Sequence, residues 1–256
     1  MQIITLLTDF GLKDPYVGIM KGVILSINPN TTIIDITHNV SPQDIREGAF
    51  LMKEYYPYFK SGTIHVAVID PTVGGERRPI IFCKDEHFFV GPDNGMFSHI
   101  IEANSEIYEI KNSDFMLKNI SSTFHGRDIF APAAAYLASG IHPSVFGPKV
   151  VNPVYLADIF PDIINGVLTG EVVMFDRFGN AVTNIDSEIF NDFINANPFE
   201  IHIGSITFSS LNKSYYEQNF TCLINSSGYI EFGCYKGSFS REAGIKKKDI
   251  VRVGLL

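Results

Sequence analysis

The run IHVAVI at residues 64–69 constrains the fold most, because five of its six residues are apolar and Asp70 follows at once. An apolar run of this length is typical of a strand that is buried on both faces, as in a parallel sheet. In open α/β sheets, ligands bind at the carboxyl ends of such strands. We therefore expect Asp70 at a crevice, with the glycine turn that carries Arg77 and Arg78 beside it.

Strand and helix patterns alternate around this run. Further strands are expected at residues 2–7, 32–36, 80–84 and 87–90. One helix is expected to begin at Asp14-Pro15, a second to use Ser41 as its N-cap with Pro42 in the first position, and a third to follow His125 and end at Gly140. This alternation predicts an α/β domain with a central, mainly parallel sheet and right-handed crossovers.

The pattern changes at about residue 165, where short β-rich runs are separated by Gly, Asn and Ser turns. These runs cover residues 170–175, 201–208, 220–224, 229–232 and 250–253. Little helical periodicity is present, so the pattern predicts a smaller all-β, barrel-like domain. We expect domains at residues 1–160 and 165–256, with the proline-rich segment 141–164 as a linker.

Composition excludes some classes of function. The net charge of −8 disfavours a nucleic-acid surface, which would require a basic stripe. No stretch approaches the roughly 18 apolar residues of a membrane span, and no basic region precedes the short apolar N-terminal run, so we expect a cytoplasmic protein without a membrane partner. Cys83, Cys222 and Cys234 are odd in number and widely spaced, which favours reduced, buried thiols over a metal site or disulfides.

Polar residues at predicted element ends are the candidate functional groups. Asp9 and Asp70 follow strands, and His125 precedes a helix, so all three could meet Arg77 at one edge of the sheet. Each also has an ordinary explanation, since such residues often cap helices or lie on solvated faces. The sequence lacks HExxH, CxxC and GxSxG patterns, which argues against a zinc protease, a redox pair and a serine hydrolase. Spacing alone predicts only a crevice.

Motifs along nearly the whole chain carry a resemblance. They are TDFG (8–11), DITHNVSPQDIREGA (35–49), VIDPTVGGERR (68–78), GPDNG (91–95), FHGRDIFAP (124–132), DRFGN (176–180) and NSSGYIE (225–231). Through them the chain resembles the S-adenosylmethionine (SAM) hydrolases that form adenosine and methionine, also called SAM hydroxide adenosyltransferases. That family is homologous to the SAM-dependent fluorinase and chlorinase.

The resemblance implies an N-terminal α/β domain, a C-terminal β-barrel and a homotrimer. Ligands would lie between the N-terminal domain of one subunit and the C-terminal domain of its neighbour. SAM would be the substrate and adenosine a product, with no separate cofactor and no metal. Asp70, Arg77 and His125 match the family residues thought to position and activate water. Thr72 departs from the family's usual glycine, and a turn that required positive φ there would be strained.

Further matches imply roles in substrate binding. Asp9 matches the carboxylate that holds the ribose hydroxyls, and Asp176 matches the acidic residue near the methionine amine. Asn180 matches the amide that binds adenine. Ser226 and Glu231 match residues beside the methionine moiety.

The implied reaction is displacement at the ribose C5′. The sulfonium of SAM makes methionine a neutral leaving group, so the site must chiefly prepare the water. Two versions remain open. Asp70 could accept a proton from the water, or Arg77 could favour hydroxide while Asp70 only orients it, because a nearby guanidinium reduces the basicity of a carboxylate.

Three rival functions remain. A halogenase is disfavoured because Asp70-Pro71 stands where the fluorinase-like pattern has an aromatic residue, Gly126 lacks the hydroxyl that the fluorinase has, and the chain has no Trp. A sensor that binds SAM or adenosine without useful turnover would need the same pocket. A purely structural trimer would leave the polar clusters without a role.

Overall fold

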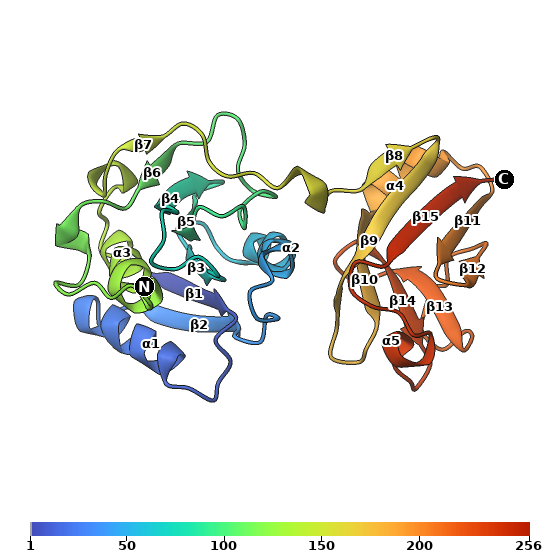
Figure 1. Cartoon of the computed structure of the whole chain (residues 1–256), viewed down its shortest axis with the longest axis horizontal. Coiled ribbons are helices and arrows are strands. Elements are labelled where there is room, and N and C mark those ends of the chain that lie inside the picture. The colour runs from blue at the N-terminus through green and yellow to red at the C-terminus, as the bar shows by residue number, and fades with distance from the viewer. Residues whose placement is uncertain (1) are drawn as a thin grey trace. The chain divides into compact units, whose positions relative to one another are not determined.

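The computed structural model describes residues 2–256, and the chain forms two compact units that divide between Leu156 and Ala157 (Figure 1). The described part of the first unit contains one sheet with the strand order β2-β1-β3-β5-β4-β6-β7. These strands are β1 (Ile3–Thr8), β2 (Thr32–Thr37), β3 (Ile64–Val68), β4 (Pro79–Lys84), β5 (His87–Pro92), β6 (Ile107–Glu109) and β7 (Lys149–Val150). The predicted α/β architecture is therefore confirmed.

The sheet is mixed, so the prediction of a mainly parallel sheet is correct only for its first half. The strands β2, β1, β3 and β5 pair in parallel, whereas β5, β4, β6 and β7 pair antiparallel. Only Asp85 and Glu86 join β4 to β5, with φ angles of 50° and 61°. A two-residue hairpin turn requires positive φ at both positions, and so short a connection cannot make a parallel crossover.

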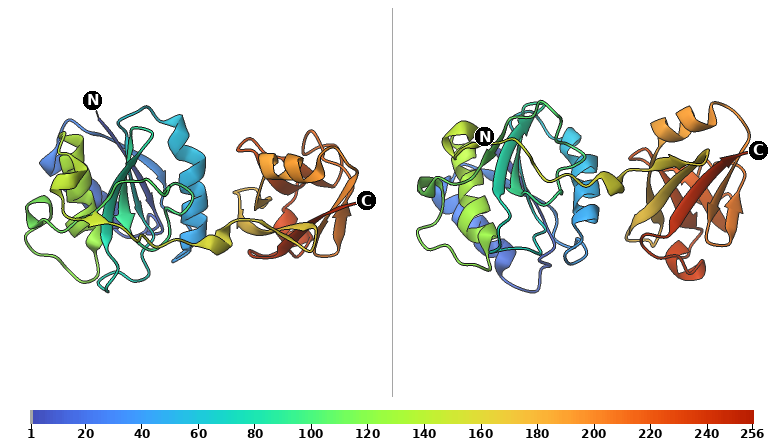
Figure 2. Two further views of the ribbon diagram at one scale, coloured as in Figure 1. Left: turned by 90° about the horizontal axis from the view of Figure 1, so that it is seen from above. Right: turned by 45° about the horizontal axis from the view of Figure 1, so that its top comes forward.

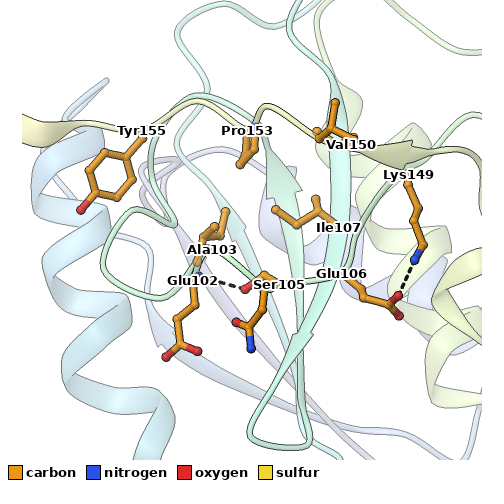
Figure 3. Close-up of a pocket in the computed structure, with 12 residues that line it drawn as sticks. Glu102, Ala103, Ser105, Glu106, Ile107, Lys149, Val150, Pro153 and Tyr155 are labelled. Atoms are coloured by element: carbon orange, nitrogen blue, oxygen red, sulfur yellow. Dashed lines mark hydrogen bonds and ion pairs between the residues drawn. The ribbon is translucent and has the colours of Figure 1, made fainter.

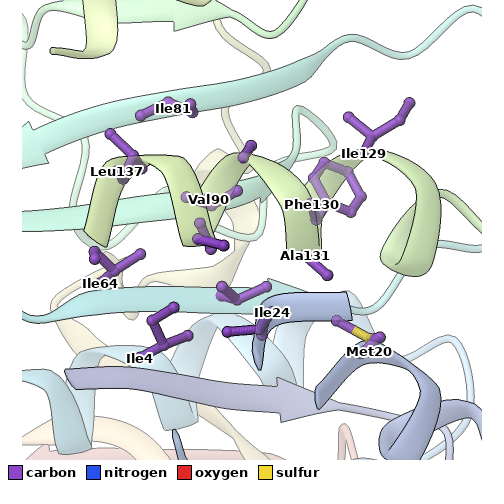
Figure 4. Packing of buried hydrophobic residues seen from close by; sticks show 14 of the residues in the cluster. Ile4, Met20, Ile24, Ile64, Ile81, Val90, Ile129, Phe130, Ala131 and Leu137 are labelled. Atoms are coloured by element: carbon purple, nitrogen blue, oxygen red, sulfur yellow. The ribbon is translucent and has the colours of Figure 1, made fainter. Parts of the chain in front are cut away.

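Helices cover both faces of this sheet. The left view of Figure 2 shows α2 (Ile45–Tyr55) on one face and α1 (Tyr16–Ile27) with α3 (Ala131–Ala138) on the other. Met20 and Ile24 of α1 are fully buried against the alanine-rich α3, which brings the helices close together over the strands (Figure 4). This buried cluster holds α1 and α3 on the same face of the sheet.

The start of α2 differs from the prediction. Asp44 is the N-cap, because its side chain accepts a hydrogen bond from the backbone N–H of Glu47 at 3.0 Å. Gln43 has a φ of +67°, so a helix cannot run through it from Ser41. The remaining helical turns of the first unit are η1 (Tyr56–Tyr58), η2 (Ser113–Phe115), the π-helical turn η3 (Gly126–Phe130) and η4 (Pro143–Val145).

The second unit is built on an antiparallel, barrel-like sheet, as expected. In the part of the chain that the structure describes, its order is β12-β11-β15-β9-β10-β14-β13, with β8 added against β9. The strands are β8 (Asp162–Ile164), β9 (Val167–Phe175), β10 (Ala181–Asp186), β11 (Phe199–Ile203), β12 (Ile206–Phe208), β13 (Phe220–Ile224), β14 (Tyr229–Cys234) and β15 (Ile250–Leu255). Phe208 and Phe220 from the two edge strands line one pocket, so the sheet curls until its edges face each other.

The second unit also contains helices that the sequence analysis did not predict. They are α4 (Ser187–Ile194), α5 (Phe239–Glu242) and the short η5 (Ala157–Ile159). Asp186 caps α4 by accepting a hydrogen bond from the N–H of Ile189 at 2.9 Å, and α4 buries Phe190 completely. Segment 141–164, expected to be a linker, contains η4 and β7 of the first unit as well as η5 and β8 of the second.

Two smaller expectations concern cysteines and membranes. All three cysteines are free, but Cys83 is exposed, because strand alternation points it away from the buried Phe82. Cys222 and Cys234 are buried, as predicted. Within residues 2–256, none of the helices combines the length and the apolar character that a membrane span requires.

Candidate active site

Asp70, Arg77 and His125 meet at the carboxyl end of β3. Asp70 lies two residues beyond the strand, Arg77 follows in the next turn, and His125 immediately precedes η3. Arg77 Nε donates to Asp70 Oδ1 at 3.1 Å and to Oδ2 at 2.9 Å, and Arg77 Nη2 reaches Oδ2 at 2.5 Å. The same Nη2 lies 2.6 Å from His125 Nδ1. Three residues from distant parts of the sequence therefore form one hydrogen-bonded cluster.

Little solvent reaches the ion pair at the centre of this cluster. The side chains of Arg77 and Asp70 are only 6% and 4% exposed. The Arg77 guanidinium also lies 5.3 Å from the centre of the Phe130 ring, a favourable position for a cation over an aromatic face. A buried charge must be paired and hydrogen-bonded, so each of these residues depends on the other.

The partner of Nδ1 determines the protonation form of His125. A guanidinium can only donate, so Nδ1 is the acceptor and the ring proton of neutral His125 lies on Nε2. Burial, and next the positive charge of Arg77, hold the pKa of His125 below its ordinary value. His125 is thus a neutral imidazole near pH 7 and presents an N–H donor from Nε2.

The turn after Asp70 accommodates Thr72 without the strain considered above. Val73 N donates to Asp70 O at 3.2 Å, and Gly75 N donates to Thr72 O at 3.0 Å. Thr72 is not among the residues with positive φ, whereas Gly74 has a φ of +77°. A Cβ at Gly74 would lie 2.1 Å from Ser122 O. Glycine is therefore required at 74, where the turn meets the loop that leads to His125.

An aromatic-lined pocket of about 230 Å³ opens beside the cluster. Asp70 and His125 line it together with Phe10, Tyr16 and Phe124, whose ring centroids lie 5.1 to 5.9 Å apart in edge-to-face contacts. Sequence reasoning did not assign these aromatic residues to the site. Phe10 and Phe124 do lie within the TDFG and FHGRD motifs, so their proximity to Asp9 and His125 was the available signal.

Asp9 lies in the turn that also carries Phe10, directly after β1. Its Oδ2 accepts a hydrogen bond from the backbone N–H of Gln43 at 2.8 Å. This contact joins the end of β1 to the turn before α2. The structure therefore places Asp9 one residue from the pocket wall, and its own side chain is half-buried.

In the second unit, Asp176 and Asn180 lie on a pocket of about 540 Å³. Asp176 Oδ1 accepts from the backbone N–H of Phe178 and of Asn180, each at 2.9 Å, and Oδ2 accepts from Asn180 Nδ2 at 2.9 Å. The carboxylate thereby fixes both the turn and the amide. Tyr215 and Cys234 line the same pocket, although sequence reasoning assigned no role to Tyr215.

Glu231 and Ser226 do not line this pocket. Glu231 is buried; its Oε1 accepts from Tyr215 Oη at 2.6 Å and its Oε2 from Asn225 Nδ2 at 2.8 Å. Burial raises the pKa of Glu231, while both hydrogen bonds oppose that rise. Ser226 is exposed in the turn between β13 and β14, at the end of the hairpin opposite Cys234. Glu231 therefore supports the pocket through Tyr215.

A wider pocket of about 660 Å³ lies elsewhere in the first unit, between β6, β7 and the segment before the unit's end (Figure 3). Glu106 and Lys149 form an exposed ion pair at its margin. None of the residues that the sequence predicts for the site lines it. Across residues 2–256, no group of three or more His, Cys, Asp or Glu side chains is arranged to hold a metal ion.

Comparison with known proteins covers both units. Residues 4–147 match the SAM hydroxide adenosyltransferase N-terminal domain, and residues 170–252 match the C-terminal domain of the same family. A protein of Methanocaldococcus jannaschii named (R)-S-adenosyl-L-methionine hydrolase is 36% identical, over 99% of this chain and 96% of its own length. A protein of the same name from Thermus thermophilus is 33% identical, over 99% of this chain and 100% of its own length.

More distant and structural relatives agree with this assignment. A protein of Actinoplanes sp. named fluorinase is 28% identical over 72% of this chain and 71% of its own. The crystal structure of an uncharacterized conserved protein from Thermotoga maritima has a TM-score of 0.89 and 33% identity, covering 98% of this chain and 99% of that one. With both domains matched in sequence, the chain belongs to the SAM hydroxide adenosyltransferase family.

Proposed function

We infer that the protein hydrolyses SAM to adenosine and L-methionine by attack of water on the ribose C5′. The observation that carries this conclusion is the hydrogen-bonded cluster of Asp70, Arg77 and His125 on a pocket, in a chain whose full-length curated relatives are named SAM hydrolases. Such a cluster offers an acceptor and donors for a single water molecule. SAM itself is the substrate, and we propose that no further cofactor takes part.

We propose that Asp70 is the acceptor for the proton of the water. Within the cluster, Arg77 only donates and His125 Nδ1 is already occupied, so the Asp70 carboxylate is the group able to accept. Asp70 Oδ1 has the longer contact with Arg77, at 3.1 Å, which makes it the oxygen better able to accept a second hydrogen bond. His125 Nε2–H would then donate to the water oxygen and orient it.

In this step the water oxygen forms a bond to C5′ while the C5′–S bond breaks. The electron pair of that bond stays on sulfur, which becomes the neutral thioether of methionine. One proton leaves the water through Asp70 and reaches solvent. The leaving group needs no acid, so the cluster acts on the nucleophile alone, by orienting it and by offsetting charge that develops on its oxygen.

We propose that substrate binding is divided between the two pockets. Asp9 would accept from the ribose hydroxyls next to the pocket of the first unit. Asn180 would bind the adenine edge, and Asp176, which fixes Asn180, would attract the methionine amine. Ser226 and Glu231 were expected beside the methionine. We propose that Ser226 contacts the methionine from its exposed hairpin turn, and the hydrogen bond of Glu231 to Tyr215 supports an indirect role for Glu231.

We further propose a homotrimer in which neighbouring subunits share each site. This proposal is supported by the separation of the water-activating residues and the adenine-binding residues into different units of the chain. Sedimentation of the purified protein should give three chains per particle. Mixed refolding of Asp70→Asn with Asn180→Ala should restore part of the activity that each variant lacks. No restoration in mixed trimers would contradict sharing between subunits.

The decisive experiment uses SAM in water enriched in ¹⁸O. Adenosine and methionine should form in equal amounts, and the adenosine should gain two mass units on its 5′ oxygen. Binding of SAM without release of adenosine over hours would instead identify a sensor. Adenosine without the label would show that water does not attack C5′.

A halogenase is the second candidate, and the fluorinase relatives are the observation in its favour. Gly126 lines the pocket beside Asp70 without contributing a hydroxyl, which disfavours it. Incubation with SAM and excess chloride or fluoride tests this directly. Formation of 5′-halo-5′-deoxyadenosine would overturn hydrolysis as the proposed reaction.

A further inference from the structure

We infer that His38 is a positioning residue that fixes the turn of residues 8–11, and through it Asp9, for binding the ribose. The inference rests on the proposed function, since it concerns how the same substrate is held. His38 lies at the carboxyl end of the parallel strand β2, beside β1, so its side chain and the turn meet at the edge where the site is built.

Contacts from both the side chain and the backbone of His38 hold this turn. His38 Nδ1 lies 2.8 Å from Thr8 Oγ1, and His38 O accepts from Gly11 N at 2.7 Å. Thr8 Oγ1 in turn accepts from Phe10 N at 3.3 Å. The imidazole of His38 therefore holds Thr8, and through its hydroxyl Phe10, whereas Gly11 is held by the backbone carbonyl of the same residue.

The directions of these hydrogen bonds follow from their partners. Because Thr8 Oγ1 accepts from Phe10 N–H, its own hydroxyl proton is available for His38 Nδ1. His38 Nε2 lies 3.1 Å from Asp35 Oδ1, which can only accept, so this neighbour favours the ring proton on Nε2, although the two atoms are poorly aligned for a hydrogen bond. Lys21 Nζ binds the other oxygen of Asp35 at 2.6 Å. The carboxylate thus stabilises the Nε2–H form by charge.

Thr8, His38 and Asp35 have the order of a nucleophile, a base and an orienting acid, yet burial excludes that use. Thr8 is 0% exposed and His38 is 4% exposed, so no substrate reaches the hydroxyl. A buried, connected set of polar groups of this kind favours one local arrangement of the backbone. The arrangement therefore serves the turn.

The turn carries the parts of the site that need accurate placement. Phe10 forms the wall of the pocket that Asp70 and His125 line, and Asp9 accepts from Gln43 N at 2.8 Å. Gln43 is held in the left-handed region at a φ of +67°. Asp9 is consequently held by Gln43 at its carboxylate, and its chain neighbours Thr8 and Phe10 are held by the network of His38.

The test separates binding of the ribose from the chemical step. In His38→Ala and in Thr8→Val, the KM for SAM should rise and the affinity for adenosine should fall by about tenfold, the size expected for loss of a hydrogen bond to a charged group. The kcat should stay within about twofold, because no reacting atom is touched. Affinity for 2′,3′-dideoxyadenosine should change little, so the preference for adenosine over this analogue should disappear.

Rescue and controls keep the test decisive. His38→Asn places an amide oxygen near the position of Nδ1 and should recover most of the preference for adenosine over the dideoxy analogue. The control His202→Ala alters an exposed histidine of the other unit and should leave this preference unchanged. A folded Thr8→Val or His38→Ala with the wild-type preference would overturn the inference while leaving hydrolysis intact. A wild-type protein that binds neither nucleoside would overturn the proposed function and this inference together.

Discussion

Arg77 Nη2 lies 2.6 Å from His125 Nδ1, and this single contact assigns the proton of the imidazole to Nε2. His125 therefore enters the reaction as a donor. The carboxylate of Asp70, held by the same guanidinium, is left as the acceptor. The roles within the cluster follow from the fact that an arginine has donors only.

Asp70→Asn should lower the turnover of SAM by about 10² to 10⁴, because an amide cannot take the proton of the water. Binding of SAM should change much less, since the amide has nearly the same shape. Quenched assays of adenosine formation measure the turnover, and calorimetry measures the affinity for SAM. Asp162→Asn, an exposed aspartate in β8, is the matched control. Turnover near that of the wild type would eliminate Asp70 as the proton acceptor.

His125→Gln and His125→Ala distinguish a donor from a base. Glutamine can place an N–H near the position of Nε2, so it should retain clearly more activity than alanine, for which we expect a loss of about 10². A base at this position would make both variants equally poor. His142→Gln, a largely exposed histidine in the same unit, controls for the substitution itself.

The pH dependence of kcat/KM should show an acidic limb from His125. Burial and Arg77 lower the pKa of this group, so the neutral form persists at pH 7 and the rate falls only when the pH passes below the ordinary range of histidine. Protonation would then remove the acceptor of Arg77 and place two cations together. In His125→Gln this limb should be absent, and its persistence there would assign it to another group.

Buried His65 should make the stability of the protein sensitive to acid. Its Nδ1 lies 2.8 Å from Thr5 Oγ1, and its Nε2 lies 3.1 Å from His87 Nδ1. Burial lowers the pKa of His65 to about 3 from 6.5. Between pH 3 and pH 6.5, the unfolded chain therefore binds more protons than the folded chain. The free energy of unfolding should fall by on the order of 1 kcal/mol per pH unit from pH 6.5 toward pH 3.

Urea unfolding at a series of pH values measures this slope. His65→Gln should flatten the slope, although the variant starts from a lower stability because the packing of a buried ring is lost. The exposed His202 provides the comparison, and His202→Gln should leave the slope as it is. An equal slope in wild type and His65→Gln would refute this assignment.

Gly74→Ala should reduce activity by more than tenfold, because the added Cβ would lie 2.1 Å from Ser122 O and would displace the loop before His125. Gly140→Ala is an unusually close control. Gly140 also has positive φ, at +90°, but nothing lies within 4 Å of the added Cβ. Both variants should lose about 1 kcal/mol of stability from the backbone conformation, and only Gly74→Ala should lose turnover.

Much of the fold could be predicted from periodicity. Local patterns indicate the strand β3 that ends two residues before Asp70, the helix after Pro15 and the strand at Phe220–Ile224. The β4–β5 hairpin was not recognised as antiparallel because Asp85-Glu86 lacks the Gly or Asn that usually marks such a turn. The helix α4 has only eight residues, too few to establish a helical period between strands.

The site was predicted less from patterns than from resemblance. Strand-end positions suggested Asp9 and Asp70, but nothing local could show that Arg77 binds both Asp70 and His125, since that depends on how distant segments pack. The contribution of Tyr215 to the second pocket was missed for the same reason, because it lies in an irregular loop without periodicity. Contacts between residues that are far apart in the sequence leave no periodic pattern that could predict them.

The π-helical turn η3 separates His125 from the packed helix α3. Its hydrogen-bonded loop is one residue wider than that of an α-helix, because Ala131 N–H bonds to Gly126 O, and such turns are frequent at functional sites. His125 and Gly126, which line the pocket, therefore lie outside the regular hydrogen-bond ladder of the helix whose alanines fill the core.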